Sequence, residues 1–171
     1  MLNNGKRKMT INVLLNAIGE AEGARPDYWK GNPYDLTLGK GKYSPASGPI
    51  SEMLVKNVKN LQKQMVKNGA PSGAVGKYQF INKTLLELQK ALKFKDTDVF
   101  SPELQDKMAN KLLERRGLKK FLKGEIHIKN FMKNLSKEWA SLPNPETGVS
   151  YYGQRTHFSV NDMYKILSET L

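Results

Sequence analysis

The sequence predicts a mainly helical α+β fold in a single domain spanning residues 1–171. Apolar residues recur at spacings of three and four along most of the chain, which indicates amphipathic helices. One short stretch, YDLTL, alternates polar and apolar residues and closes on GKG, which is typical of a strand entering a tight turn. With 171 residues, of which 39% are hydrophobic, the chain can bury one core. We therefore expect mainly helices with one short β segment.

The first two helices are predicted from caps and from periodicity. The first is expected from Thr10, a suitable N-cap, to Gly23, a residue type that often follows a helix end. The second is expected over residues 50–68, because lysines occupy the side opposite an apolar stripe. The stripe consists of Ile50, Leu54, Val58, Leu61 and Met65.

Four further helices follow. Thr84 and Glu87 have the spacing of a capping box and predict a helix start. Ser101 and Pro102 predict the start of another, which ends before Gly117. The last two are expected over residues 125–140 and from Ser159 onward. In the helix expected over residues 125–140, the apolar stripe consists of Ile128, Phe131, Leu135 and Trp139. We therefore interpret Trp139 as a core residue.

Composition narrows the function classes. The chain has no cysteine and two isolated histidines, His127 and His157, so we expect neither a metal site nor a cofactor. The net charge of +12 would attract nucleic acid, anionic lipid or bacterial cell wall, although solvated lysines without a function would give the same count. No apolar run reaches about 18 residues and no secretory segment is recognisable, so we expect a soluble protein without stable membrane insertion.

The first helix ends on two glutamates that differ in their predicted surroundings. Its apolar stripe runs through Leu14 and Ile18, and four further residues lead to Glu22. Glu20 lies about 200° around the helix from Ile18 and should be solvated. Glu22 should therefore point toward the core.

An inward carboxyl group at the C-terminal end of a helix has a raised pKa, because desolvation and the helix dipole both disfavour its charge. A carboxylic acid that stays protonated near neutral pH can act as a general acid, as in glycosidases. The alternative is that the helix frays before Glu22 and leaves this side chain at the surface.

Several blocks of sequence follow one another in a recognisable order. They are Glu22-Gly23, YDLTLG, SGAVGKYQF, FSPELQDKMANKLLERRGL and EWASLP…SYYGQ, and they extend from Glu22 to Gln154. In this order they resemble the lambda-type phage endolysins and related phage muralytic domains. The resemblance implies a lysozyme-like fold, with a small β-hairpin lobe beside a helical lobe. It also implies cleavage of the β-1,4 bond between N-acetylmuramic acid and N-acetylglucosamine. The Gly and Tyr-Gln motifs are also similar to those of bacterial lytic transglycosylases.

The resemblance implies roles for particular residues. Glu22 matches the single catalytic acid of the family, and Tyr34 and Asp35 match the YD that opens its β segment beside the cleft. Asp35 is then a second carboxylate, or equally a capping or hairpin residue. Tyr152 matches a tyrosine that lines the saccharide groove, although the residues alone favour a packing role.

The block SGAVGKYQF adds three expected substrate contacts. Gly76 would let the backbone approach a sugar closely, Gln79 offers an amide to sugar hydroxyls or an N-acetyl group, and Tyr78 offers an aromatic face with a polar tip. The alternative is a glycine-rich turn before a helix whose aromatic residues are core.

One segment departs from the family pattern. Between Lys40 and Ser72 lambda-type members have a mainly extended segment, whereas this chain predicts the lysine-rich helix at 50–68. Because of this difference, the family pattern does not predict the number and preference of the sugar subsites in the cleft. The prediction for Glu22 is unaffected.

Two reaction types fit these residues. The resemblance favours a lytic transglycosylase, in which the muramic acid 6-hydroxyl attacks and leaves a 1,6-anhydro sugar, because lambda-type members work with one acid. The alternatives are a hydrolytic muramidase that uses Asp27 or Asp35 and a non-catalytic cell-wall-binding module of the same fold.

The expected partner is therefore the glycan strand of peptidoglycan. No nucleic acid is expected, because no recognisable reader motif accompanies the charge. We expect a monomer that is made in the host cytoplasm and released to the wall, or that is carried in the virion.

Overall fold

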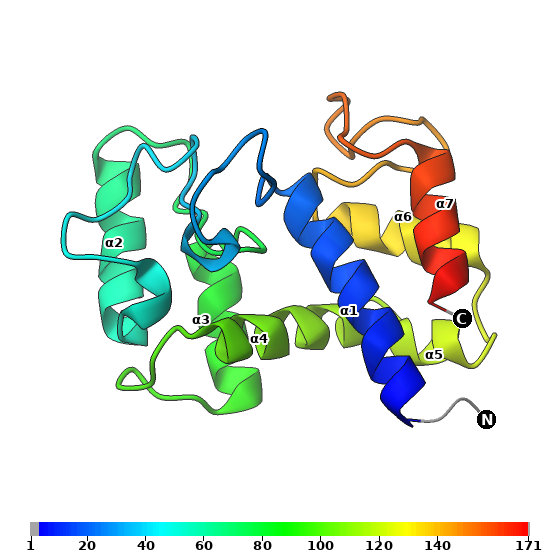
Figure 1. Ribbon diagram of the computed structural model, residues 1–171, viewed down its shortest axis with the longest axis horizontal. Helices are drawn as coiled ribbons and strands as arrows, with labels where there is room; N and C mark the ends of the chain where they lie inside the picture. Colours follow the sequence, from blue (N-terminus) through cyan, green and yellow to red (C-terminus); the bar gives the residue numbers. More distant parts are fainter. Residues whose placement is uncertain (1–3, 171) are drawn as a thin grey trace. The chain divides into compact units, whose positions relative to one another are not determined.

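The computed structural model describes the backbone of residues 4–170 and the side chains of residues 11–170. This part of the chain is mainly helical, as the sequence predicts (Figure 1). Its α-helices are α1 (Asn4–Ala21), α2 (Val55–Lys67), α3 (Asn82–Leu92), α4 (Pro102–Arg115), α5 (Leu118–Leu122), α6 (Ile128–Glu138) and α7 (Val160–Glu169). Two 3₁₀ helices, η1 (Pro33–Asp35) and η2 (Ile50–Glu52), precede α2 in the described chain.

Contacts within the chain define two compact units. One comprises Met1–Glu22 and Asn110–Leu171 and is called the terminal unit below. The other comprises Gly23–Ala109 and is called the middle unit. Glu22 and Tyr152 belong to the terminal unit, whereas the other predicted site residues belong to the middle unit.

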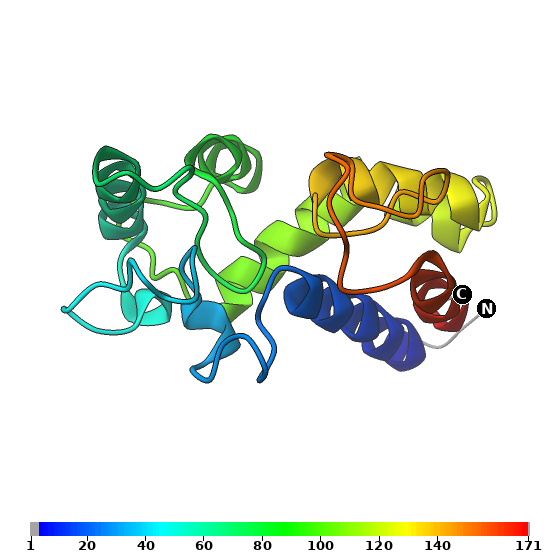
Figure 2. The ribbon, with the colours of Figure 1, turned by 90° about the horizontal axis from the view of Figure 1, so that it is seen from above.

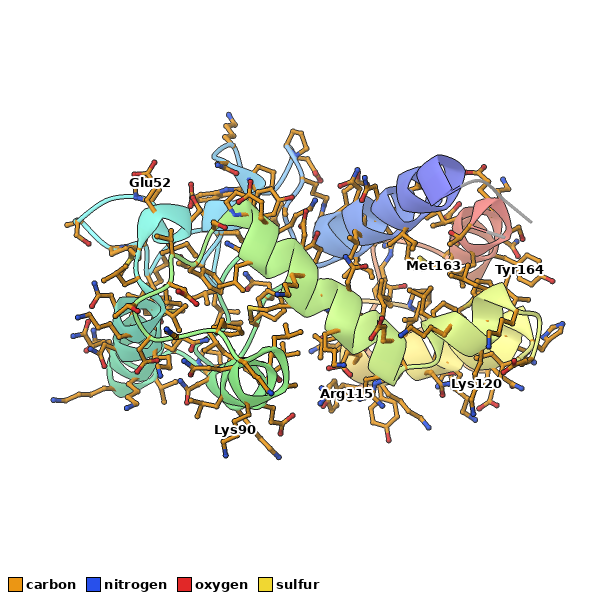
Figure 3. All side chains as sticks on the ribbon, turned by 90° about the horizontal axis from the view of Figure 1, so that it is seen from below. Glu52, Lys90, Arg115, Lys120, Met163 and Tyr164 are labelled. Carbon is orange, nitrogen blue, oxygen red and sulfur yellow. The ribbon has the colours of Figure 1, made fainter. Side chains whose placement is uncertain are left out.

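In the terminal unit, α7 packs against both α1 and α6 (Figures 1 and 2). Met163 of α7 is fully buried, and Figure 3 shows it turned toward the interior of this unit while Tyr164 points away. Phe121 of α5 stacks on Phe131 of α6 with ring centroids 4.6 Å apart. Trp139 is 4% exposed, which confirms its interpretation as a core residue.

The first helix begins earlier than its predicted cap. Because α1 starts at Asn4, Thr10 lies inside the helix and the prediction of Thr10 as the N-cap is wrong. The lysine, arginine and methionine that precede Thr10 are good helix formers, so the helix continues through them. The predicted apolar face is confirmed, since Leu14 and Ile18 are both fully buried.

The helix predicted at 50–68 forms from Val55 to Lys67. The first residues of the predicted range are not part of this helix. Phe100 N–H donates to the Met53 carbonyl at 2.8 Å, and Val55 N–H donates to the Asp98 carbonyl at 2.9 Å. These bonds keep residues 53–54 extended. The helix then runs beside α3 in the opposite direction (Figures 1 and 2).

The strand predicted at YDLTL is wrong for its first half. Asn32 caps η1 by accepting a hydrogen bond from Tyr34 N–H, and Pro33 favours this turn, so Tyr34 and Asp35 are in a 3₁₀ helix. Extended backbone is limited to isolated bridges in the described residues, among them one between Thr37 and Val75. The predicted turn at GKG does form, with three successive positive φ angles at residues 39–41. The segment therefore pairs with residues 74–76 rather than within a hairpin of its own.

The other boundaries are mostly as predicted. Helix α3 begins at Asn82 with Ile81 as its N-cap, so the capping box that predicted Thr84 as the N-cap is wrong by three residues. Helix α4 begins at Pro102, and the Ser101 hydroxyl accepts from Leu104 N–H at 3.3 Å. Helix α7 begins after Ser159, whose side chain forms a capping box with Asp162.

Candidate functional site

Glu22 directly follows α1 and lies on its buried side. Its backbone N–H donates to the Ile18 carbonyl at 3.0 Å, so the helical geometry persists to this residue. The hydroxyl of Ser141 donates to Glu22 Oε1 at 2.5 Å. The side chain is only partly exposed, and the alternative of a frayed helix end with a solvated carboxylate is therefore wrong.

This environment changes the acidity of Glu22. Desolvation by burial raises the pKa of its carboxyl group from an ordinary 4.5 to about 7, although hydrogen bonds from the hydroxyl and the backbone of Ser141 act in the opposite direction. A carboxyl group with this pKa holds its proton in a large fraction of molecules at neutral pH. It can therefore donate that proton to an oxygen atom as a bond breaks.

Ser141 is held in place by the end of α6. Glu138, the last residue of α6, has only 7% of its side chain exposed and accepts from both Arg115 and Arg116, at 3.2 and 2.5 Å. The next turn is closed by a hydrogen bond of 3.0 Å from Leu142 N–H to the Trp139 carbonyl. These contacts fix the backbone on both sides of Ser141, which the sequence analysis did not identify.

Replacing Ser141 by alanine is expected to raise the pKa of Glu22 above its present value of about 7. Both hydrogen bonds from Ser141 favour the carboxylate, and the substitution removes the one from the hydroxyl. NMR titration of carboxyl-labelled glutamate measures the change. Ser136→Ala is the matched control, because the Ser136 hydroxyl donates to the Lys133 carbonyl instead. An unchanged or lower pKa in Ser141→Ala would contradict the assigned contact.

The raised pKa also predicts how stability depends on pH. Between pH 4.5 and 7 the folded protein binds a proton at Glu22 that the unfolded chain releases, so this group costs stability as the pH rises through that window. Glu22→Gln carries no such proton. Relative to the wild type, the variant should gain about 2 to 3 kcal/mol of unfolding free energy on going from pH 4 to pH 8. Urea denaturation of both proteins measures this difference, and a constant difference would argue against the raised pKa.

In the middle unit, Tyr34 and Tyr78 share the carboxylate of Asp106 on α4. The Tyr34 hydroxyl donates to Asp106 Oδ1 at 3.0 Å, and the Tyr78 hydroxyl donates to the same oxygen at 2.6 Å. Lys77 Nζ lies 4.9 Å from the centroid of the Tyr34 ring and 5.3 Å from that of Tyr78. Burial and Asp106 raise the pKa of both phenols, that of Tyr34 to about 12, so both stay neutral donors.

Tyr78 is only 1% exposed, so its ring packs inside the protein. The contact that the structure shows is with Asp106, and the expected contact with a sugar remains a prediction. Asp106 itself was missed by the sequence analysis, which assigned no functional residue to the helix that begins at Pro102.

Gly76 packs against the protein's own side chains. It has φ +81°, and a Cβ atom at this position would lie 2.4 Å from Gln105 Oε1. The same oxygen accepts from Lys77 N–H at 3.0 Å, and Gln105 Nε2 donates to the Phe100 carbonyl at 3.1 Å. Glycine is thus required for packing here, and a role of Gly76 toward a sugar remains a prediction.

Gln79 and Asp35 each have a partner in the middle unit. Gln79 Nε2 donates to the Gly76 carbonyl at 3.0 Å and to the Leu36 carbonyl at 3.3 Å. Asp35 Oδ1 accepts from Ser51 N–H at 2.8 Å, a bond that joins η1 to η2. This contact favours the structural alternative for Asp35.

Tyr152 lies on a loop of the terminal unit and is the most exposed of the predicted site residues. It is 74% exposed, and its ring meets that of Tyr151 edge to face at 5.5 Å. Ser150 holds the loop, because its hydroxyl oxygen accepts from the backbone N–H groups of Tyr152 and Gln154. An exposed ring on a fixed backbone is suited to stacking on a sugar.

Two classes of site are not found in the described part of the chain. Residues 11–170 contain no group of three or more histidine, aspartate or glutamate side chains placed to hold a metal ion. Among the described helices, none has the length and apolar character needed to cross a membrane.

Comparisons with known proteins relate this chain to phage enzymes. A family model described as Endolysin matches residues 12–169. The solved structure of bacteriophage lambda lysozyme complexed with a chitohexasaccharide is similar, with a TM-score of 0.59 and 22% sequence identity. The match covers 99% of this chain and 94% of the lambda chain, and it shows a lysozyme-like fold. No curated protein matches the chain.

Proposed function

Because the chain belongs to the endolysin family, the peptidoglycan-degrading lysins of bacteriophages, we propose that Glu22 is the general acid that cleaves its glycan strands. The bond cleaved is the β-1,4 link between N-acetylmuramic acid and N-acetylglucosamine. The observation that carries this proposal is the Glu22 carboxyl group, which is desolvated, contacted by Ser141 and has a pKa of about 7. The lambda lysozyme was solved with a chitohexasaccharide, which supports a glycan ligand here as well.

The proposed reaction starts with proton transfer from Glu22 to the bridging oxygen. The leaving sugar departs as its bond breaks, and positive charge develops on the remaining ring, as in other glycosidases. Ser141 orients the carboxyl group and accepts no proton itself. After the transfer the carboxylate of Glu22 can act as a base toward the next nucleophile.

We propose that Tyr152 and Gln79 contact the glycan, and that the other predicted residues support the site. Tyr152 offers an exposed ring, and Gln79 keeps its carbonyl oxygen for a sugar hydroxyl or an N-acetyl N–H, because its amide nitrogen is used by the backbone. Tyr34 and Tyr78 act through Asp106, and Gly76 and Asp35 support the backbone of the same unit.

The muramic acid 6-hydroxyl is the proposed nucleophile, which makes the enzyme a lytic transglycosylase. Hydrolysis would need a second carboxylate to direct water. Asp35 is engaged by Ser51, and Asp27 is paired with Arg25 at 3.1 Å, so both candidates have structural partners. In this proposal residues 1–171 act as one catalytic domain, monomeric and without a cofactor, that reaches the wall from the host cytoplasm or from the virion.

Mass spectrometry of digested peptidoglycan tests the reaction type. Purified sacculi are incubated with the protein, and the muropeptides are analysed without chemical reduction. Products that carry 1,6-anhydro-muramic acid, and so lack the mass of an added water, are expected. Muramic acid with a free reducing end would instead identify a hydrolase and overturn the transglycosylase proposal.

A further inference from the structure

A pocket of about 350 Å³ opens in the middle unit between residues 42–46 and the second half of α2. A volume of this size is sufficient for a small ligand. Its lining includes Lys42, Ser44, Leu61, Gln64, Met65 and Asn68. None of these residues takes part in the proposed glycan cleavage.

The lining combines one positive charge with neutral hydrogen-bonding groups. Lys42 contributes an amino group, Ser44 a hydroxyl group, and Gln64 and Asn68 contribute amides. Within residues 11–170, the side-chain amides of Gln64 and Asn68 make no hydrogen bond to another residue, so both are available to a ligand. Lys42 Nζ lies 5.4 Å from the centroid of the Tyr43 ring, which holds it beside the pocket.

Apolar side chains complete the lining. Met65 is 1% exposed and Leu61 is partly buried, and both come from α2. Together with the polar groups they suit a ligand that carries a carboxylate, amide groups and small alkyl side chains. No acidic side chain lines the pocket to neutralise Lys42.

We propose that this pocket binds the stem peptide of peptidoglycan, an inference that rests on the proposed action on that polymer. The sugar hydroxyl and acetamido groups of a peptide-substituted strand are neutral, whereas its carboxylates are on the peptide. Lys42 therefore pairs with a peptide carboxylate, the two amides bind peptide groups, and the alanine methyl groups contact the partly exposed Leu61. The pocket belongs to the segment that departs from the lambda-type sequence pattern, which gives this departure a role in substrate choice.

Binding of isolated stem peptides tests the inference separately from catalysis. The probes are synthetic L-alanyl-γ-D-glutamyl-X-D-alanine peptides in which X is lysine or diaminopimelate, titrated into ¹⁵N-labelled protein. The amide signals of residues 42–46 and 61–68 are expected to shift. Lys42→Gln should weaken binding about fivefold, as expected for a partly exposed charge pair. A peptide with its C-terminal carboxylate amidated should also bind more weakly to the wild type.

Lys63→Gln is the matched control, because it removes the same charge from an exposed position of α2 outside the pocket lining. Its affinity should stay within about twofold of the wild type. Absence of shifts with both peptides, or equal weakening by the two substitutions, would overturn the pocket assignment. If the peptides bind as expected but Glu22→Gln still cleaves the glycan, the proposed function fails while the binding site stands. If Glu22 is essential but no peptide binds, only the present inference fails.

Discussion

Glu22→Gln is expected to lower the rate at which the protein clears a peptidoglycan suspension by about a thousandfold. Glutamine has nearly the same shape as glutamate, and its carbonyl oxygen can still accept the hydrogen bond from Ser141. It has no acidic proton to give to the bridging oxygen. The decrease of turbidity at pH 6, where most Glu22 carboxyl groups of the wild type are protonated, measures the loss.

Glu20→Gln is the control for this substitution. It makes the same chemical change two residues earlier, at an exposed position of α1, and should leave clearing unchanged. Pull-down with insoluble peptidoglycan separates binding from cleavage, and Glu22→Gln should be retained like the wild type. Equal clearing by Glu22→Gln would remove Glu22 from the mechanism. A wild-type protein that binds without clearing would identify a non-catalytic wall-binding module.

Gly76→Ala is expected to lower the free energy of unfolding by about 3 to 4 kcal/mol, because it combines backbone strain with a clash. Residue 76 has φ +81°, and the added Cβ would lie 2.4 Å from Gln105 Oε1. Gln105 is fully buried, its Oε1 accepts a hydrogen bond from Lys77 N–H, and its Nε2 donates one to the Phe100 carbonyl. The side chain therefore cannot move aside without losing these bonds. Chemical denaturation measures the change.

Gly69→Ala separates the two contributions. Gly69 also has a positive φ, of +90°, but no heavy atom lies within 4 Å of a Cβ added there. This variant should lose only about 1 to 2 kcal/mol from the backbone conformation. Similar losses in the two variants would show that the contact with Gln105 has no energetic importance.

Helical periodicity predicted the inward position of Glu22, but it left a frayed helix end open as the alternative. The side chains of Leu14 and Ile18 are buried, and one more turn of the same helix brings Glu22 to the same face. The pKa shift could be anticipated for the same reason. Ser141 could not be found in this way, because it contacts Glu22 across a sequence separation of 119 residues and no local pattern encodes that contact.

The main features that the sequence did not predict are the buried polar residues. Gln62 is 1% exposed, and its amide donates to the Gly73 and Phe80 carbonyls at 2.9 and 2.8 Å. The predicted stripe of α2 placed Leu61 in the core instead. Asp106 and Gln105 were missed on α4 for the same reason, since apolar periodicity does not detect a polar side chain that is satisfied by hydrogen bonds.

The strand at YDLTL failed because a local cap outweighed the alternating pattern. Asn32 and Pro33 favour a turn, and this turn includes Tyr34 and Asp35 before any strand can begin. The second half of the segment, from Leu36 to Leu38, does form backbone hydrogen bonds with residues 74–76. The five-residue alternation predicted that extended backbone would occur here. It did not predict at which residue that backbone begins or with which segment it pairs.

The arginine pair at Glu138 has a consequence for experiments at different ionic strengths. Dissolved ions weaken the attraction between exposed charges. They weaken the ion pairs of Glu138 with Arg115 and Arg116 far less, because the Glu138 side chain is only 7% exposed. The turn that carries Ser141 should therefore keep its geometry in concentrated salt, while a protein of net charge +12 loses its attraction to an anionic wall. Inhibition by salt would then report the encounter with the bacterial surface and not a change at the acid.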